Sequence, residues 1–226
     1  MDKNINYIIS YPRSANTFIR TCVEVITRKK TLDCNSRDDK ISDINLTGTP
    51  ILYKEHKIKS NLKNANKLIL ILRNYKDVYI SNIILRMYNK KISDVDFSYN
   101  KMMEFEYNSF FDDYYNLIKF YDNFKNEKLL IYYEDLMENN IIIKNIIDFI
   151  LPRNNFIINK EIIDNISKKS KNKYKKNAGI KTEKIKNLHT IFTIEQNNNI
   201  DNKFREYNPK LYDKYLDRYR KIKKNS

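Results

Sequence analysis

The chain has 226 residues, of which 41% are hydrophobic; this suits a single core, so we expect one domain spanning residues 1–226. No stretch reaches the apolar length of a membrane span and the N-terminus lacks a signal-peptide pattern, which argues against membrane insertion and secretion and predicts a soluble, cytoplasmic protein. The net charge of +15 favours anionic partners, from nucleic acid to a small nucleotide, although solvated helix faces explain most of the lysines.

Apolar periodicity predicts an alternation of strands and helices. The strands are apolar on both faces, which is typical of parallel strands covered by helices, so we expect a three-layer α/β/α fold with a central parallel sheet. A polar, lysine-rich stretch over residues 168–186 predicts mainly loop. In chain order, the expected elements are a strand at Asn6–Ser10, a helix at Asn16–Arg28, strands at Ile51–Lys54 and Lys67–Leu72, helices at Asn74–Met87 and Met103–Phe124, a strand at Lys128–Tyr132, and helices at Ile141–Ile150 and Pro209–Tyr219.

The segment between the first strand and the first helix reads YPRSANTF over residues 11–18. A loop that enters a helix presents backbone N–H groups that favour an anion. Arg13 adds a forked cationic donor, and Ser14 and Thr17 add hydroxyls. We interpret the segment as a P-loop-like phosphate-binding loop, although it lacks the Walker A pattern. An ordinary strand-to-helix turn explains this segment, taken alone, equally well.

The third predicted strand runs into RNYKDVYIS, residues 73–81. Ligands of parallel α/β sheets gather at the carboxyl ends of the strands, so Arg73 stands where a second phosphate can bind. Ser81 falls two turns into the following helix. A capped surface helix is the alternative reading of this segment.

The second predicted strand ends in Lys54-Glu55-His56. A neutral imidazole at this position can accept the proton of an attacking hydroxyl near pH 7. Lys54 can stabilise negative charge on a departing group. The alternative is an exposed histidine without a function.

The fourth predicted strand ends in YYEDL, residues 132–136, where Tyr133 can contact a base or a substrate ring, and Glu134 and Asp135 can orient neighbouring loops. The alternative is a strand end followed by a helix cap. We expect no metal site from the two cysteines, because Cys22 and Cys34 lack histidine or cysteine companions at metal-ligand spacing.

Together these four segments resemble the cytosolic-type sulfotransferases that use 3′-phosphoadenosine 5′-phosphosulfate (PAPS). The family patterns Y-P-[KR]-S-G-[TN]-T-W, K-T-H, R-N-P-K-D-V-x-x-S and Y-E-D-[LM] read YPRSANTF, KEH, RNYKDVYIS and YEDL in this chain. Near the C-terminus, FTIEQN at residues 192–197 is similar to the family's F-T-V-x-Q-N. The resemblance spans residues 5–200, and its order along the chain matches the order of the four strand ends.

The resemblance implies a reaction. The chain would move the sulfuryl group of PAPS to an acceptor hydroxyl or amine by in-line displacement without a metal, releasing the desulfated nucleotide PAP. Three catalytic residues are implied: His56 as the general base, Lys54 beside the transferring sulfuryl group, and Arg13 near the bridging oxygen that leaves. Cationic side chains would then stabilise the developing charge themselves.

The resemblance also implies a nucleotide site. The loop after the first strand would hold the 5′-phosphosulfate, Arg73 and Ser81 would hold the 3′-phosphate, and two aromatic rings would contact the adenine. The implied binding residues are Arg13, Ser14, Ala15, Asn16, Thr17, Phe18, Arg73, Ser81, Tyr133 and Lys181, with Phe18 and Tyr133 at the adenine.

The chain departs from the family pattern at several places. Ala15 replaces a glycine, so the loop must accommodate a Cβ close to the ligand. Phe18 replaces a tryptophan and Tyr75 a proline. The late element R-K-G-x-x-G has no glycines here, and Lys181 stands near the place of its arginine.

Two other functions remain open on the sequence: a P-loop nucleotide kinase, and a binding protein for nucleic acid or another polyanion. We expect PAPS and one acceptor as partners in preference to nucleic acid, and the acceptor can be a small molecule, a carbohydrate or a peptide. Aromatic residues within 87–111 can line an acceptor pocket, but packing in the core is the favoured interpretation. The family's dimer motif has lost its charged ends here, so oligomeric state stays open.

Overall fold

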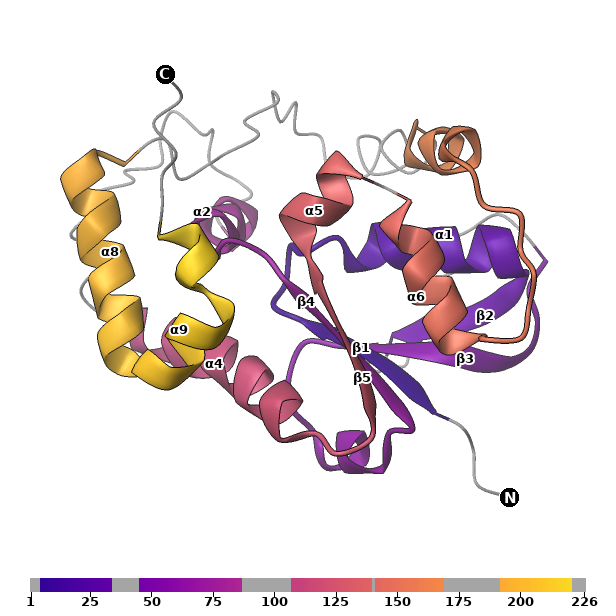
Figure 1. Cartoon of the computed structure of the whole chain (residues 1–226), viewed down its shortest axis with the longest axis horizontal. Coiled ribbons are helices and arrows are strands. Elements are labelled where there is room, and N and C mark those ends of the chain that lie inside the picture. The colour runs from indigo at the N-terminus through magenta and orange to yellow at the C-terminus, as the bar shows by residue number, and fades with distance from the viewer. Residues whose placement is uncertain (1–4, 34–44, 87–106, 140, 169–191, 221–226) are drawn as a thin grey trace.

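The computed structural model describes residues 5–33, 45–86, 107–139, 141–168 and 192–220. Within these ranges the chain forms one five-stranded sheet in the order β2-β3-β1-β4-β5, and every neighbouring pair is parallel (Figure 1). The expected central parallel sheet is therefore confirmed. Its strands are β1 (Asn6–Ser10), β2 (Lys29–Asp33), β3 (Thr47–Glu55), β4 (Lys67–Leu72) and β5 (Glu127–Tyr132).

Helices cover both faces of this sheet, as a three-layer fold requires (Figure 1). α1, α5 and α6 pack on one face, and α2, α4, α8 and α9 pack on the other. The described helices are α1 (Asn16–Thr27), η1 (Ser60–Asn64), α2 (Tyr75–Arg86), α4 (Tyr107–Asn123), α5 (Tyr133–Glu138), α6 (Ile142–Ile150), α8 (Ile194–Tyr207), α9 (Pro209–Tyr215) and η4 (Asp217–Tyr219).

Strand β4 shows how the two cores arise from one sequence pattern. All six of its residues are buried, and successive side chains of a strand point to opposite faces. Leu68, Leu70 and Leu72 therefore join the core beneath α2 and α4, whereas Ile69 and Ile71 join the core beneath α1 and α6. A strand apolar on both faces needs a helical layer on each.

Strand β2 was not expected, because it carries charged and polar residues and lies at the edge of the sheet. This strand is held to α1 by buried polar contacts, and not by a run of apolar side chains. Thr31 donates to Glu24 Oε1 from its backbone nitrogen at 3.2 Å and from its hydroxyl at 2.6 Å. Arg20 Nε donates to the same hydroxyl at 2.9 Å.

The short helices η1 and α5 were also missed, and so were two longer helical stretches. Residues 160–168 are helical, and so is the polar segment Ile194–Tyr207 that forms α8. The latter begins with a capping box, in which the Thr193 hydroxyl accepts from the Gln196 backbone nitrogen and the Gln196 side chain accepts from the Thr193 nitrogen. Four buried residues, including Ile200 and Phe204, were too few for the apolar pattern to be recognised.

The aromatic residues at the start of α4 pack in the core, as favoured above. Phe110 and Phe111 are each 4% exposed, and both contact Phe204. The other residues of the expected aromatic stretch lie outside the described side chains. Among the described helices, none combines the length and the apolarity that crossing a bilayer requires.

Candidate active site

The candidate site lies at the carboxyl edge of the sheet, where parallel strands place their C-terminal loops side by side (Figure 1). Ser10 ends β1, Glu55 ends β3, Leu72 ends β4 and Tyr132 ends β5. β1 is central and pairs with both β3 and β4. The predicted segments after these strands are therefore neighbours in space.

The loop after β1 has an unusual backbone. Arg13 and Ala15 both have positive φ, 73° and 63°, in the left-handed region that favours glycine. This conformation costs a non-glycine residue about 1 kcal/mol. Ala15 is also the N-cap of α1 and makes no side-chain cap. The first N–H groups of α1 are therefore left for another acceptor, and an anion suits them.

Several buried polar atoms around this loop have no hydrogen-bond partner within the described ranges. They are Ser14 Oγ, Asn16 Oδ1 and Arg73 Nε. Asn16 is positioned by its other amide atom, because Nδ2 donates to Ser10 Oγ at 2.7 Å. Buried polar groups are normally satisfied, so this cluster fits a ligand with several oxygens.

The two arginines meet at the loop. Arg13 Nε donates to Ser81 Oγ at 3.1 Å, and Arg73 Nη1 donates to the carbonyl oxygen of Arg13 at 2.7 Å. The Arg73 guanidinium also lies over the Tyr133 ring, 4.3 Å from its centroid. Four predicted site residues from β1, β4, α2 and β5 segments are thus brought together: Arg13, Arg73, Ser81 and Tyr133.

Among the described residues, neither Arg13 nor Arg73 forms an ion pair with a carboxylate. Arg73 is only 9% exposed. A buried charge is costly unless it is paired. The arrangement is suited to an anionic ligand that reaches both arginines.

Thr17 and Phe18 occupy the first turn of α1 beside the loop. Both are half-buried, and Phe18 packs against the core under α1. Tyr133 packs against the same core from the start of α5. The two rings predicted at the adenine therefore flank one apolar cluster.

His56 follows β3 and hydrogen-bonds to the end of β1. Its Nδ1 lies 2.8 Å from the carbonyl oxygen of Ser10. A carbonyl oxygen can only accept, so Nδ1 carries the proton and Nε2 keeps its lone pair. Burial, and after it the charge of Lys54, lower the pKa of His56 below the ordinary value of 6.5. The imidazole is therefore neutral at pH 7, as a general base must be.

Lys54 is paired, which the sequence did not indicate. Its Nζ lies 2.8 Å from Asp33 Oδ2, and both side chains are mostly buried. Asp33 ends β2, the strand that was missed, so its carboxylate could not be placed. Lys54 therefore lies beside the candidate site as one partner of an ion pair.

Glu134 orients a neighbouring loop, as expected from its motif. Its Oε1 accepts from the backbone nitrogen of Asn74 at 2.8 Å, and its Oε2 accepts from the hydroxyl of Tyr219 at 2.8 Å. Burial raises its pKa, while these hydrogen bonds oppose the rise. The carboxylate holds the turn that follows Arg73. The YEDL motif was the only feature of the sequence that pointed to Glu134.

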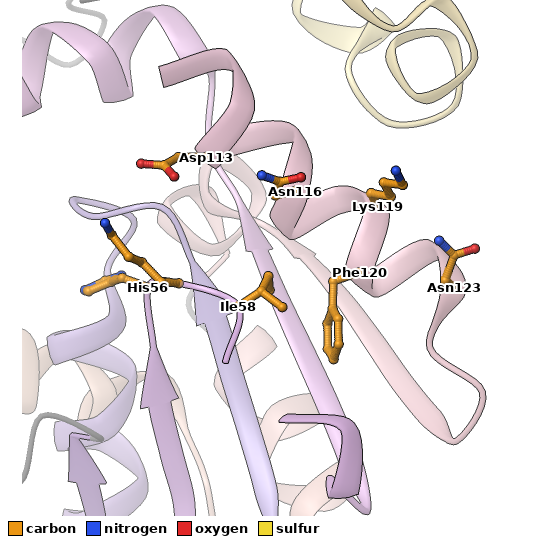
Figure 2. A pocket seen from close by; sticks show the side chains of 8 residues that line it. His56, Ile58, Asp113, Asn116, Lys119, Phe120 and Asn123 are labelled. Atoms are coloured by element: carbon orange, nitrogen blue, oxygen red, sulfur yellow. The ribbon is translucent and has the colours of Figure 1, made fainter. Parts of the chain in front are cut away.

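An open cavity of about 510 Å³ lies beside His56. One wall is the segment after β3, with His56, Lys57 and Ile58 (Figure 2). The other wall is a face of α4. Its lining residues are Asp113, Asn116, Lys119, Phe120 and Asn123. No motif or pattern indicated that this face of α4 belongs to a site.

Lys181, the remaining predicted binding residue, lies outside the described residues. Within the described ranges, no group of three or more histidine, cysteine or acidic side chains gathers as a metal site would require.

Comparison with known proteins identifies a family and similar folds. The family described as "Sulfotransferase domain" matches residues 16–221. No match was found among curated proteins. The structure is similar to the mouse sulfotransferase SULT7A1 complexed with PAP, with a TM-score of 0.63, 18% sequence identity, and coverage of 96% of this chain and 90% of the mouse chain.

Two structures of retinol dehydratase are also similar. The complex with androsterone and the inactive cofactor PAP has a TM-score of 0.57 and 13% identity, covering 94% of this chain and 81% of that one. The complex with retinol and PAP has a TM-score of 0.55 and 14% identity, covering 94% and 82%. At these identities the likeness establishes the fold.

Proposed function

This chain belongs to the sulfotransferase domain family, and from that premise we propose that it moves the sulfuryl group of PAPS to an acceptor hydroxyl or amine. The observation that supports this donor most directly is the pair of arginines at the loop after β1. They share a contact and form no ion pair with a carboxylate among the described residues, although the charge of Glu134 acts on Arg73. A nucleotide with phosphate groups at both ends supplies the missing negative charge.

We assign the ends of the nucleotide from the neighbours of each arginine. The 5′-phosphosulfate would accept from the uncapped start of α1, from Arg13 and from the unpartnered hydroxyl of Ser14. The 3′-phosphate would bind Arg73 and Ser81, and Arg73 Nε has no other acceptor within the described ranges. Phe18 and Tyr133 would contact the adenine, because both flank one apolar cluster. We also retain Ala15, Asn16, Thr17 and Lys181 as expected contacts, on the resemblance alone.

His56 is the proposed general base. The acceptor oxygen forms a bond to sulfur while the bond from sulfur to the 5′-phosphate oxygen breaks. The acceptor proton passes to His56 Nε2, whose lone pair is available because Nδ1 donates to Ser10. Arg13 stabilises the negative charge that develops on the departing phosphate, and Lys54, steadied by Asp33, adds positive potential.

Binding of PAP to an Arg73→Ala variant tests the nucleotide site. A buried charge-assisted contact contributes about 1.5–3 kcal/mol, so the variant should bind PAP about 10- to 100-fold more weakly in isothermal titration calorimetry. Arg153→Ala is the matched control, since Arg153 is exposed and has no contact among the described residues. An unchanged PAP affinity in Arg73→Ala removes Arg73 from the site.

We further propose, from the sequence argument, that the chain acts in the cytoplasm as one domain spanning residues 1–226. The family match over residues 16–221 supports the single domain.

A further inference from the structure

We propose that the cavity between the segment after β3 and helix α4 binds the acceptor, and that this acceptor is a saccharide. The proposal rests on the sulfuryl transfer proposed above and adds the class of its second substrate. It is carried by the lining of the cavity, in which hydrogen-bonding side chains without described partners lie beside an apolar surface of similar extent (Figure 2).

Position assigns the cavity to the acceptor. His56 lines it, and His56 is the proposed base, so a hydroxyl bound here lies beside the group that must take its proton. A volume of about 510 Å³ is within the ordinary range for small-molecule sites.

The polar side chains of the cavity are not used elsewhere. Lys57, Asp113, Asn116, Lys119 and Asn123 make no hydrogen bond or ion pair to any described residue. Asp113, Asn116 and Asn123 lie on one face of α4, at spacings of three and seven residues. The face thus presents two amides and a carboxylate to whatever enters.

Other polar residues of the same helix behave differently. Asp112 accepts from the hydroxyl of Tyr207. Asp122 pairs with Lys214 at 2.5 Å and accepts from Tyr215 at 2.6 Å. The carboxylates outside the cavity are engaged in holding α8 and α9, whereas Asp113 inside it has no structural partner. Among the side chains of α4 that the structure describes, the polar groups without a partner lie in the cavity.

A saccharide matches this lining. Its hydroxyls both donate and accept, as amides and carboxylates require, and its C–H face can lie on the half-buried ring of Phe120 with Ile58 nearby. A flat apolar acceptor would leave the polar groups without partners, which costs affinity. Lys57 and Lys119 outweigh Asp113, so a cationic acceptor is disfavoured and a neutral or mildly acidic sugar is favoured.

The transfer step is then O-sulfation. A sugar hydroxyl oxygen bonds to the sulfur of PAPS, the bond from that sulfur to the 5′-phosphate oxygen breaks, and the hydroxyl proton moves to His56 Nε2. The products are a sugar sulfate ester and PAP.

An acceptor screen with labelled PAPS tests this. One arm holds methyl glucoside, maltose and methyl glucuronide; the other holds 2-naphthol and a hydroxysteroid. Preferred labelling of the saccharides supports the proposal. Preferred labelling of the apolar alcohols, or no labelled saccharide from an enzyme that binds PAP, overturns it while leaving the donor assignment intact. Failure of PAP to bind overturns the proposed function instead.

Variants connect the preference to this cavity. Asn116→Leu should raise KM for the labelled saccharide about ten-fold, the scale of one lost hydrogen-bonding group, and leave the Kd for PAP unchanged. Asn199→Leu, an exposed asparagine on α8, is the matched control and should change neither. Equal KM values in Asn116→Leu and the control, with both proteins folded by circular dichroism, place the acceptor elsewhere.

Discussion

At the scale of single residues, the site combines groups whose charge states are set by their neighbours. His56 is kept neutral by burial and by Lys54, while Asp33 acts in the opposite direction. Lys54 and Asp33 are themselves joined at 2.8 Å. The pKa of this proposed base therefore depends on an ion pair at the edge of the sheet as well as on its own burial.

The dependence of the reaction rate on pH should reflect the lowered pKa of His56. A base must be deprotonated, so kcat/KM should fall as pH drops through the pKa of His56, with a midpoint below 6.5. Lys54→Met removes a nearby positive charge and should move the midpoint upward, and Asp33→Asn should move it downward. His56→Ala should abolish transfer while PAP still binds. A wild-type midpoint above 7, or opposite shifts in the two variants, contradicts the assignment.

Much of the site could be foreseen residue by residue, because its parts follow strand ends. Arg13, Arg73, Ser81 and Tyr133 do meet, and the order of the parallel strands explains why. Asp33 could not be foreseen, since its strand lacks an apolar pattern. The cavity face of α4 was equally hidden, because unpaired surface polar groups look alike in a sequence.

At the scale of elements, the helix ends show how strongly local conformation constrains residue choice. α1 ends at Arg28, which has φ 59° and donates its backbone N–H to the carbonyl oxygen of Glu24. This is the left-handed C-terminal position that glycine occupies most often. Arg28 is exposed and its side chain contacts no other described residue.

Arg28→Gly should therefore stabilise the protein by about 1 kcal/mol, because glycine adopts the left-handed conformation without steric cost. Urea unfolding followed by circular dichroism measures the change. Lys29→Gly is the control: it is an exposed neighbour in the extended strand β2, where glycine should destabilise. Destabilisation by both substitutions to the same extent argues against strain at Arg28.

The expected elements were found where burial was two-sided, as in β1 and β4, whose residues are all buried. They were missed where an element has few buried apolar residues. β2 depends on Thr31 and its hydrogen bonds to α1, and α8 begins with a capping box and has only four buried residues. Periodicity registers apolar surface, so elements held by polar contacts escape it.

At the scale of the whole molecule, the C-terminal helices are joined to the turn that carries Arg73. Asp201 of α8 is buried and pairs with the fully buried Lys76 at 2.6 Å, and it also accepts from Tyr75. Tyr219 reaches Glu134, which in turn accepts from Asn74. Residues distant in sequence by more than 120 positions thus hold the start of α2.

Asp201→Ala should be strongly destabilising, by about 3–5 kcal/mol, because it leaves the buried ammonium of Lys76 without its partner. Thermal and urea unfolding measure the loss. Asp213→Ala breaks the exposed pair with Arg205 instead and should have a far smaller effect. Similar losses in the two variants contradict a special role for the buried pair.

Ser10 connects two parts of the proposed site through its hydrogen bonds. Its carbonyl oxygen accepts from His56, and its hydroxyl accepts from Asn16 at the first turn of α1. One residue at the tip of the central strand therefore connects the donor half of the site with the acceptor half. Linkage between two ligands is reciprocal: if loading of the nucleotide strengthens capture of the second substrate, that substrate must slow escape of PAP by the same factor. A high acceptor concentration would then slow the release of PAP and inhibit turnover.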